Sequence, residues 1–534
     1  MTQPETGCDV LVVGAGLSGL TAGAYLSKAG LRVRLVEKEK QVGGLVNSFD
    51  YKGFGFDGGI RATENSGVLL PMLKQLGIEV ELRPNPVSIG IGNDVVTVSK
   101  KDDIEEYRRL LERQFPDNVT DIKAIMAEIE KIMGYLDVLY GIDNPLFLDI
   151  KNDPKYLLRT ILPWLLKYQL TVPKIAKLKQ PVDEYLERFT SSRALNDIIS
   201  QHFFRKTPAF FALSYFSIYL DYRYPKGGTG TLTRALERFI VEHGGEVLKE
   251  TEIERLEPTE KRATDSAGNV HRYQRLVWSA DMFALYRAFD SSALDTKTRA
   301  AVEKQKAAMA GKVGGDSVFT VYLTVDRDPA EFGKISAGHF FYTPSKTGLS
   351  KAVLSELADG DGFVTDRDTL AGWLKRHLAL NTYEISIPVL RDPDLAPPGR
   401  TGLIVSLLFD YRLTKHIEEM GWYDEFRRLM SDGIIEVLDS SIYPGLKDAV
   451  LDSFTATPLT IQRISGSTDG AITGWAFTND DIPAESRMPR IARSVLTPMP
   501  GIYQAGQWTY IPSGLPVSIL TGKLAADRVV KDLA

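Results

Sequence analysis

Near its start the chain reads Asp9-Val-Leu-Val-Val-Gly14-Ala-Gly16-Leu-Ser-Gly19, and a glutamate follows at position 37. Residues 9–13 are a short apolar run, which predicts a buried parallel strand. Residues 17–29 predict a helix and residues 31–36 predict a second strand. This stretch therefore predicts one strand–helix–strand unit with a glycine-rich first turn.

The three glycines of this unit have separate mechanical roles. Gly14 allows the tight turn out of the strand, Gly16 lets the backbone approach a pyrophosphate, and Gly19 lets the helix pack on the strand. The helix N-terminus supplies free N–H groups to phosphates. Glu37 is placed to accept hydrogen bonds from ribose hydroxyls and would repel a 2′-phosphate. The sequence thus predicts a dinucleotide site that is unsuited to NADP.

Two glycine pairs favour FAD over NAD at this site. The first is Gly43-Gly44, and the second lies in Asp57-Gly58-Gly59-Ile60-Arg61. Paired glycines let backbone lie against a flat, extended cofactor, although each pair alone also fits a plain loop. Arg61 is the one charged side chain expected beside the flavin, as a candidate catalytic residue; the alternative is a surface-loop arginine.

The rest of the chain predicts an interleaved domain organisation. Residues 101–220 are rich in helix formers, with apolar residues at helical spacing. The predicted segments are a first FAD-binding part at 1–100, a helical substrate and membrane region at 101–220, a second FAD-binding part at 221–300, a substrate domain with a mixed sheet at 301–487 and a third FAD-binding part at 488–534.

Composition excludes several functional classes. The net charge of −5 does not indicate a nucleic-acid partner. The single cysteine, Cys8, excludes a disulfide within the chain and is expected to be a packing residue. We find no metal-binding motif, no nucleophile elbow and no apolar stretch that predicts a transmembrane helix. The first six residues do not resemble a signal peptide, so a cytoplasmic location is expected. The oligomeric state stays open.

Several further stretches carry a resemblance to a known family. With the glycine motif and Glu37, they resemble FAD-dependent phytoene desaturases, carotenoid isomerases and retinol saturases, within the amine oxidase-like flavoproteins. The stretches are 224–228 with 244–247, residues 388–399, Thr457-Pro458-Leu459-Thr460 with Gly474-Trp475, and 500–508 with 513–516. One departure is Gln507, where many members have an acid; an uncharged residue there is typical of the isomerase and saturase branch and weakens the case for a plain dehydrogenase.

The resemblance implies an α/β fold with a Rossmann-like FAD-binding domain of the glutathione-reductase-like type, interleaved with an α+β substrate domain. It also implies an apolar polyene or isoprenoid substrate, with hydride exchange at flavin N5 or isomerisation on reduced flavin. Pro516 fits the first turn of a last helix whose N–H groups would face the flavin's pyrimidine edge. The expected cofactor contacts are Gly14, Ala15, Gly16, Ser18, Gly19, Glu37, Lys38, Gly43, Gly44, Leu45, Gly58, Gly59, Ile60, Arg61, Ile253, Gly506, Gln507, Gly514, Leu515 and Pro516.

Two apolar and aromatic stretches are candidates for contact with the substrate. Residues 156–168 place Trp164 between leucines and near Arg159 and Lys167, which suits a helix on a membrane surface. Residues 203–220 are rich in phenylalanine and tyrosine. Both also fit an ordinary core. Two other functions stay open: an amine oxidase on the same fold, and a non-catalytic prenyl-lipid carrier that resembles the Rab GDP dissociation inhibitors.

Overall fold

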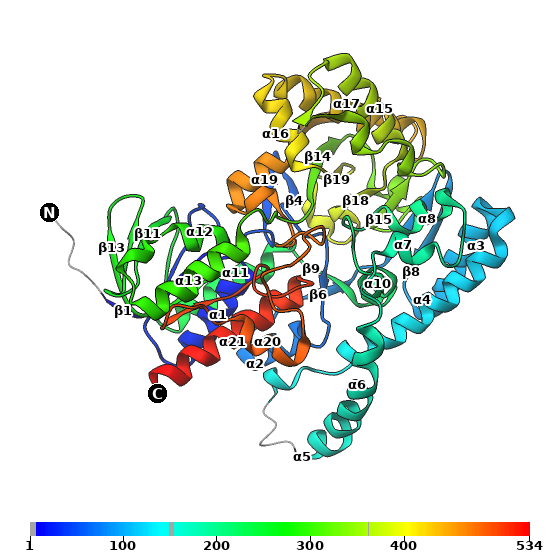
Figure 1. Ribbon diagram of the computed structural model, residues 1–534. Coiled ribbons are helices and arrows are strands. Elements are labelled where there is room, and N and C mark those ends of the chain that lie inside the picture. Colours follow the sequence, from blue (N-terminus) through cyan, green and yellow to red (C-terminus); the bar gives the residue numbers. More distant parts are fainter. Residues whose placement is uncertain (1–6, 149–153, 361) are drawn as a thin grey trace.

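The computed structural model describes residues 7–148, 154–360 and 362–534 (Figure 1). Residues 1–6, on which the expectation about a signal peptide rests, lie outside this part. Residues 149–153 of the predicted helical region also lie outside it. Two seven-stranded sheets organise the chain. Their elements come from segments that are far apart in sequence.

The first sheet has the strand order β10-β2-β1-β13-β12-β11, with β21 also paired to β13. Strands β10, β2, β1, β13 and β21 run parallel, whereas β11 and β12 form an antiparallel meander on β13. The strand bounds are β1 Cys8–Val13, β2 Val33–Val36, β10 Glu246–Leu248, β11 Ile253–Glu257, β12 Arg262–Asp265, β13 Val270–Trp278 and β21 Ile502–Gln504.

Helices cover both faces of this sheet, so its central strand is buried on both sides. Val10 and Val12 pack with α1 (Leu17–Lys28), α11 (Gly230–Glu242) and α21 (Leu515–Leu533). Leu11 and Val13 pack with α12 (Met282–Arg287) and α13 (Thr296–Met309). Cys8 is buried in the same layer, as expected. The predicted strand–helix–strand unit is confirmed.

The second sheet is mixed and has the order β20-β14-β19-β18-β15-β7-β8. Among the strand pairs of this sheet in the described residues, β15 and β7 are parallel and the others are antiparallel. The bounds are β7 Val87–Ile91, β8 Asp94–Val98, β14 Ser317–Val325, β15 His339–Thr343, β18 Tyr383–Ser386, β19 Thr401–Phe409 and β20 Val450–Ala456. The predicted segment 1–100 therefore supplies strands to both sheets, because β7 and β8 pair beside β15 instead of with β1.

Alternation along these strands gives the second sheet two different faces. One face is apolar, with Phe319, Val321, Val405 and Ile385, and packs against helices α15 (Arg367–Leu380), α16 (Tyr411–Glu419) and α17 (Tyr423–Ser440). The opposite face carries Thr320, Ser406, Glu384 and His339. Small elements connect the sheets: β3 Ser48–Tyr51, β4 Phe54–Asp57, β5 Thr63–Glu64, β6 Leu82–Pro84, β9 Tyr222–Pro225, α2 Leu69–Leu76, α19 Pro458–Ser465 and α20 Ile491–Ser494.

The predicted helical region forms a bundle with its own core. Its helices are α3 Ile104–Gln114, α4 Val119–Tyr140, α7 Val182–Leu186, α8 Arg193–Ser200, α9 Ala209–Leu213 and α10 Tyr215–Asp221. Ile122, Ile125, Ile129 and Ile132 of α4 are buried in this core, as their spacing predicts. Within the described ranges, no helix has the length and apolar character needed to cross a membrane.

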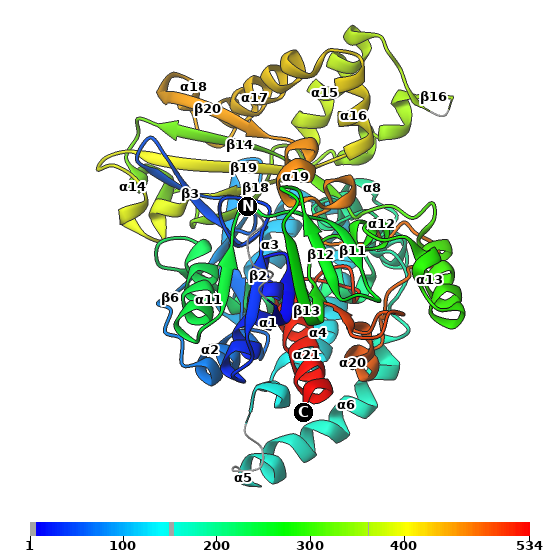
Figure 2. The same cartoon turned by 90° about the vertical axis from the view of Figure 1, so that its left-hand side faces the viewer.

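Helix α6 (Leu162–Ile175) extends from the foot of the molecule in both views (Figures 1 and 2). Pro163, a residue type that kinks or ends a helix when it lies in the interior, is in the first turn of α6. A π-helical turn at Leu157–Ile161 comes directly before it, and the Leu162 N–H donates to the carbonyl of Leu157. The wider turn leaves room for the proline ring, so the helical path continues through this point.

Candidate cofactor site and substrate cavity

Gly14, Gly16, Gly43 and Gly44 form a backbone surface at the edge of the first sheet, here called the glycine cradle. Gly16 and Gly43 pair as an isolated bridge. A Cβ on Gly19 would collide with the Gly14 carbonyl, so position 19 must be glycine for α1 to pack against the turn after β1. A Cβ on Gly16 would meet no protein atom within 4 Å. The open space in front of Gly16 fits a pyrophosphate, since the protein itself does not require glycine there.

Glu37 lies at one end of the cradle. Its carboxylate accepts the N–H of Ala15 at 2.7 Å and the N–H of Glu39 at 3.0 Å. Burial raises the pKa of Glu37. The Glu37 carbonyl accepts the Thr251 N–H at 2.8 Å, which brings the segment before Ile253 alongside. Lys38 donates to the carbonyl of Arg463 at 2.7 Å. The predicted ribose and adenine contacts of these residues stay predictions.

The last segment of the chain closes the other end of the cradle. Gly506 has φ of +100°, and a Cβ there would lie 2.8 Å from Ser18 Oγ. The Gly506 N–H donates to Thr521 on α21 at 3.0 Å. Gly514 is the N-cap of α21, and Pro516 lies in its first turn, as predicted. The first and last predicted FAD segments therefore meet at Ser18.

Gly58 and Gly59 must be glycine because of contacts within the protein itself. A Cβ on Gly58 would collide with the Asn47 side chain, and one on Gly59 with the Leu45 carbonyl. The N–H groups of Gly58 and Ile60 donate to the carbonyls of Asn47 and Leu45 at 3.0 Å each. This pair thus packs the chain against itself, and its predicted contact with the cofactor is untested.

Asp57, directly before this pair, is fully buried and accepts four hydrogen bonds. Its donors are the Ser48 hydroxyl at 2.8 Å, the Tyr224 hydroxyl at 2.7 Å, and the Thr229 N–H and hydroxyl at 2.8 and 3.0 Å. These partners come from β3, β9 and the turn before α11. One carboxylate therefore joins the first two predicted FAD segments.

Arg61 is buried, with 4% of its surface exposed, so it is not a surface-loop residue. Its guanidinium donates to the Asp57 carbonyl at 2.6 Å and to the Ser406 hydroxyl at 3.1 Å. Arg391 donates to the Arg61 carbonyl at 2.8 Å and stacks on Tyr224. Arg61 thus ties the loop after Gly59 to the polar face of the second sheet. Its contact with a flavin stays a prediction.

His339 and Glu384 form a hydrogen-bonded pair on the same polar face, 3.0 Å apart. Burial lowers the pKa of His339. Burial acts to raise the pKa of Glu384, but the bond from His339 and the nearby Arg61 and Arg391 guanidinium groups lower it overall. A neutral imidazole therefore donates from Nε2 to an ionised carboxylate.

Aromatic rings pack between this face and the helical bundle. The rings, here called the aromatic wall, are Tyr215, Tyr219, Tyr222, His339 and Phe341. Tyr222 stacks on His339 with centroids 5.4 Å apart, and Tyr219 contacts Phe341 at the same distance. A small cavity continues from the wall, with Tyr107, His202 and Phe216 in its lining. The predicted aromatic stretch 203–220 supplies much of this surface.

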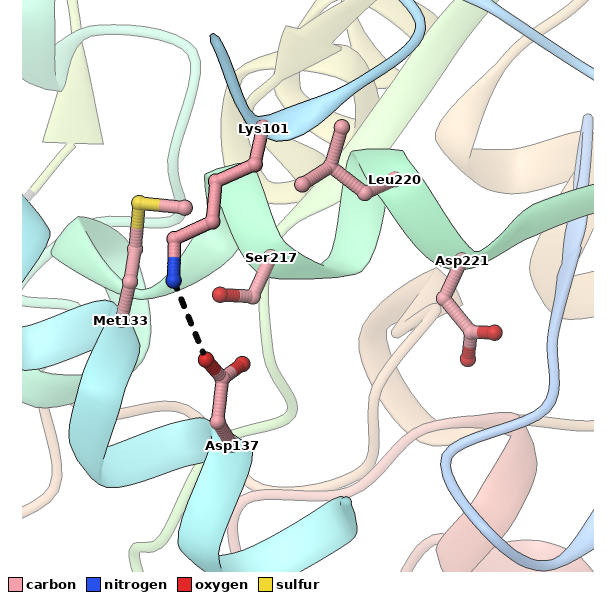
Figure 3. Close-up of a pocket in the computed structure, with 6 residues that line it drawn as sticks. All are labelled: Lys101, Met133, Asp137, Ser217, Leu220 and Asp221. Carbon is pink, nitrogen blue, oxygen red and sulfur yellow. Dashed lines mark ion pairs between the residues drawn. The ribbon is translucent and has the colours of Figure 1, made fainter.

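A larger cavity of about 190 Å³ lies on the opposite face of α10 (Figure 3). Lys101 and Asp137 reach toward each other across it and form an ion pair at 3.6 Å. Ser217, Leu220 and Asp221 lie on the far side of α10 from Tyr215 and Tyr219, by helical spacing. This polar cavity is therefore separate from the aromatic wall.

Sequence reasoning did not single out Asp57, Glu64, His339 or Glu384 as site residues. Asp57 had one usable signal, because it directly follows an apolar strand and precedes a glycine pair. In β14, Thr320, Tyr322 and Thr324 recur at alternate positions, a period of two that marks one sheet face, whereas Ser406 in β19 lies between Ile404 and Leu408 and has no such pattern. Glu64 and His339 carry no such local signal.

Comparison with known proteins agrees with this architecture. The model of the flavin containing amine oxidoreductases matches residues 17–530. The chain belongs to this family. The solved cyclohexylamine oxidase of Brevibacterium oxydans, 14% identical, superimposes with a TM-score of 0.59 over 99% of this chain and 100% of its own. The predicted α/β flavoprotein fold, the flavin cofactor and the oxidoreductase class are confirmed.

Curated relatives span almost the whole chain of this family member. Prolycopene isomerase 2 of an Oncidium hybrid cultivar is 24% identical over 98% of this chain and 84% of its own. The lycopene-forming phytoene desaturase of Pseudescherichia vulneris is 21% identical over 98% and 99%. All-trans-retinol 13,14-reductase of Danio rerio is 22% identical over 93% and 82%. The predicted resemblance is therefore confirmed.

Proposed function

We propose that this flavoenzyme acts on the carbon–carbon bonds of an apolar polyene or isoprenoid. The observation that carries the proposal is the aromatic wall, which adjoins the predicted flavin end of the cofactor site: Tyr222 pairs with Glu64, and Glu64 lies beside Gly514 at the N-terminus of α21. The rings of this wall form a buried apolar cluster, which suits a conjugated hydrocarbon better than a small polar substrate. The names of the relatives that span the chain point to the same substrate class.

The residues described would hold FAD along one edge of the first sheet. The glycine cradle would receive the pyrophosphate, Glu37 the ribose, and the N-terminus of α21 the pyrimidine edge of the flavin. The bound flavin would accept or donate a hydride at N5. The chain's own part is to hold the polyene against the aromatic wall, to exclude water and to move a proton.

A second candidate is redox-neutral isomerisation on reduced FAD. Gln507 favours it, because this position carries an acid in many desaturases of the resembled group. Gln507 lies 3.4 Å from the Ser467 hydroxyl. An uncharged amide there does not oppose the negative charge that flavin reduction produces, so a lasting reduced state is compatible with this site.

We further propose that α6 docks on a membrane surface to receive the substrate. Leu158, Leu162, Leu165, Leu166 and Leu170, here called the leucine face, are 39–71% exposed. Arg159 and Lys167 beside them are exposed as well, which favours anionic lipid. A polyene dissolves poorly in water, so an enzyme that draws it from a bilayer gains by docking there. The predicted cytoplasmic location stays a prediction.

Anaerobic incubation of the purified flavoprotein with polyenes would test the proposed reaction. The substrates are a partly saturated isoprenoid, a cis-configured polyene and its all-trans isomer. Bleaching of the flavin with a longer conjugated product would establish desaturation. Cis–trans conversion that needs prior reduction of the flavin would establish isomerisation. Bleaching by primary amines, with no reaction of any polyene, would overturn the proposal in favour of an amine oxidase.

A further inference from the structure

Glu64 lies where the cofactor segments and the aromatic wall meet. It ends the short strand β5, three residues after Arg61, and it is paired with Tyr222 of β9. On its other side is the N-terminus of α21. A Cβ placed on Gly514, the N-cap of that helix, would lie 3.9 Å from Glu64 Oε1. The carboxylate is therefore between the predicted pyrimidine end of the flavin site and the wall.

The neighbours of Glu64 are hydroxyls and one acid. Tyr140 of α4, Tyr215 of α10 and Tyr222 of β9 lie near it, as does Asp221 at the end of α10. In the part of the chain that the structure describes, Glu64 forms no ion pair. Burial raises the pKa of Glu64 to about 7, with a smaller contribution from Asp221 in the same direction and an opposing one from its own backbone N–H.

The other acids of this region already accept hydrogen bonds from neighbouring residues. Asp57 accepts four hydrogen bonds, and Glu384 is held ionised by the His339 N–H. Asp221 accepts the Ser66 N–H at 2.7 Å. Glu64 differs from all three, because the donor that acts on it is its own backbone N–H and, among the described residues, no neighbouring residue holds it in one protonation state. It can therefore exchange a proton with a bound molecule.

We propose that Glu64 is the proton-transferring catalytic residue of this site. The inference rests on the proposed action on carbon–carbon bonds. In desaturation, one C–H bond breaks with its electron pair, and the hydride passes to oxidised FAD. The C–H bond on the adjacent carbon breaks heterolytically, its proton forms an O–H bond with the Glu64 carboxylate, and its electrons form the new double bond. In saturation the substrate would take the hydride from reduced FAD at one carbon, and protonated Glu64 would give its proton to the adjacent carbon.

The neighbouring hydroxyls support this role. Tyr215 and Tyr222 are linked at 3.1 Å, and burial keeps both phenols protonated by raising their pKa values. Both are therefore neutral neighbours of the carboxylate. Tyr140, at the end of α4, lies near both Glu64 and Tyr168 of α6.

Infrared titration of the FAD-loaded protein tests the proton exchange directly. We expect a carboxylic acid carbonyl band that disappears as pH rises through about 7, and its absence in Glu64→Gln. In Asp221→Asn the band should disappear at lower pH, because a negative neighbour is gone. Glu79→Gln, an exposed glutamate that is not part of the site, is the matched control and should keep the wild-type titration.

Single-turnover flavin reduction by the polyene tests the catalytic role. Glu64→Gln should retain its FAD and slow the reaction at least 100-fold, in the range of a lost general base. The wild-type rate should fall below about pH 7, where Glu64 becomes protonated, and the residual rate of Glu64→Gln should not vary with pH there.

The outcomes separate this inference from the proposed function. A titrating band that persists in Glu64→Gln, or a variant with the wild-type rate and pH profile, would overturn the role of Glu64. A wild-type protein that reacts with no polyene would overturn the proposed function, and the infrared titration would still decide whether Glu64 exchanges a proton. Loss of FAD from Glu64→Gln would show that the residue serves cofactor binding and would overturn its catalytic role.

Discussion

Gly16 and Gly372 are both positions where an added Cβ meets no protein atom. Gly372 is exposed within α15, far in sequence from the cofactor segments. We expect Gly16→Ala to fold normally and to bind FAD at least tenfold more weakly, because the new methyl group occupies the space of the pyrophosphate. Gly372→Ala should keep its FAD and gain about 0.5–1 kcal/mol of stability. Equal flavin content in both variants would place the cofactor elsewhere.

Asp57 and Asp50 lie on the same hairpin. Comparing the stability of their asparagine variants separates the structural role of a buried carboxylate from that of a surface carboxylate. Asp57→Asn replaces one acceptor oxygen with an amide donor that faces hydroxyl and N–H groups. We expect it to lower the free energy of unfolding of the FAD-free protein by about 1–3 kcal/mol, measured in urea. Asp50 is exposed on β3, and Asp50→Asn should change little. An unchanged stability of Asp57→Asn would show that its four hydrogen bonds are not needed for the fold.

At the scale of one element, α6 determines the proposed docking on membranes. Trp164 was expected to lie in the interface, but it is partly buried, and its indole N–H donates to the Val138 carbonyl at 2.5 Å. Replacing it would disturb the packing of α6 on α4. The exposed leucines Leu158, Leu166 and Leu170 are the better test residues.

We expect the wild-type protein to float with anionic liposomes and the triple variant Leu158→Glu, Leu166→Glu, Leu170→Glu to stay in the dense fraction with its FAD retained. Glutamate removes apolar area and adds repulsion from anionic lipid. The matched control carries the same glutamate substitutions at Val241, Leu451 and Val530, which are exposed on other elements. Flotation of the triple variant, or failure of the wild type to float, would refute docking through α6.

Across the whole molecule, the cofactor site joins the two ends of the chain. Gly506 contacts Ser18, and Asp57 joins β4 to the turn before α11. We expect one non-covalent FAD per chain, released by acid, since Cys8, the single cysteine, is buried within β1. The FAD-free protein should unfold at a lower temperature, because FAD adds about 2.7 kcal/mol to the free energy of unfolding when its free concentration exceeds the Kd 100-fold. Added FAD should restore the higher melting temperature. Flavin that stays with acid-precipitated protein, or an unchanged melting temperature, would contradict this prediction.

The sequence alone predicted the features that depend on local chemistry. The strand–helix–strand unit, the glycine turn, the core face of α4 and the proline in the first turn of α21 follow from periodicity and backbone geometry within a few residues. These features can be recognised in the sequence because the residues that determine each of them lie within a few positions of one another. The same reasoning predicted a flavin cofactor, which family membership confirmed.

The contacts between distant segments came only from tertiary packing. Strands β7 and β8 joined the second sheet, Arg61 reached Ser406, and Glu64 was placed beside Gly514. No local pattern specifies these contacts, because each depends on how separate elements pack. The same holds for α6: its leucines are equally apolar in sequence, and only packing on α4 decides that Trp164 turns inward while Leu166 and Leu170 stay exposed.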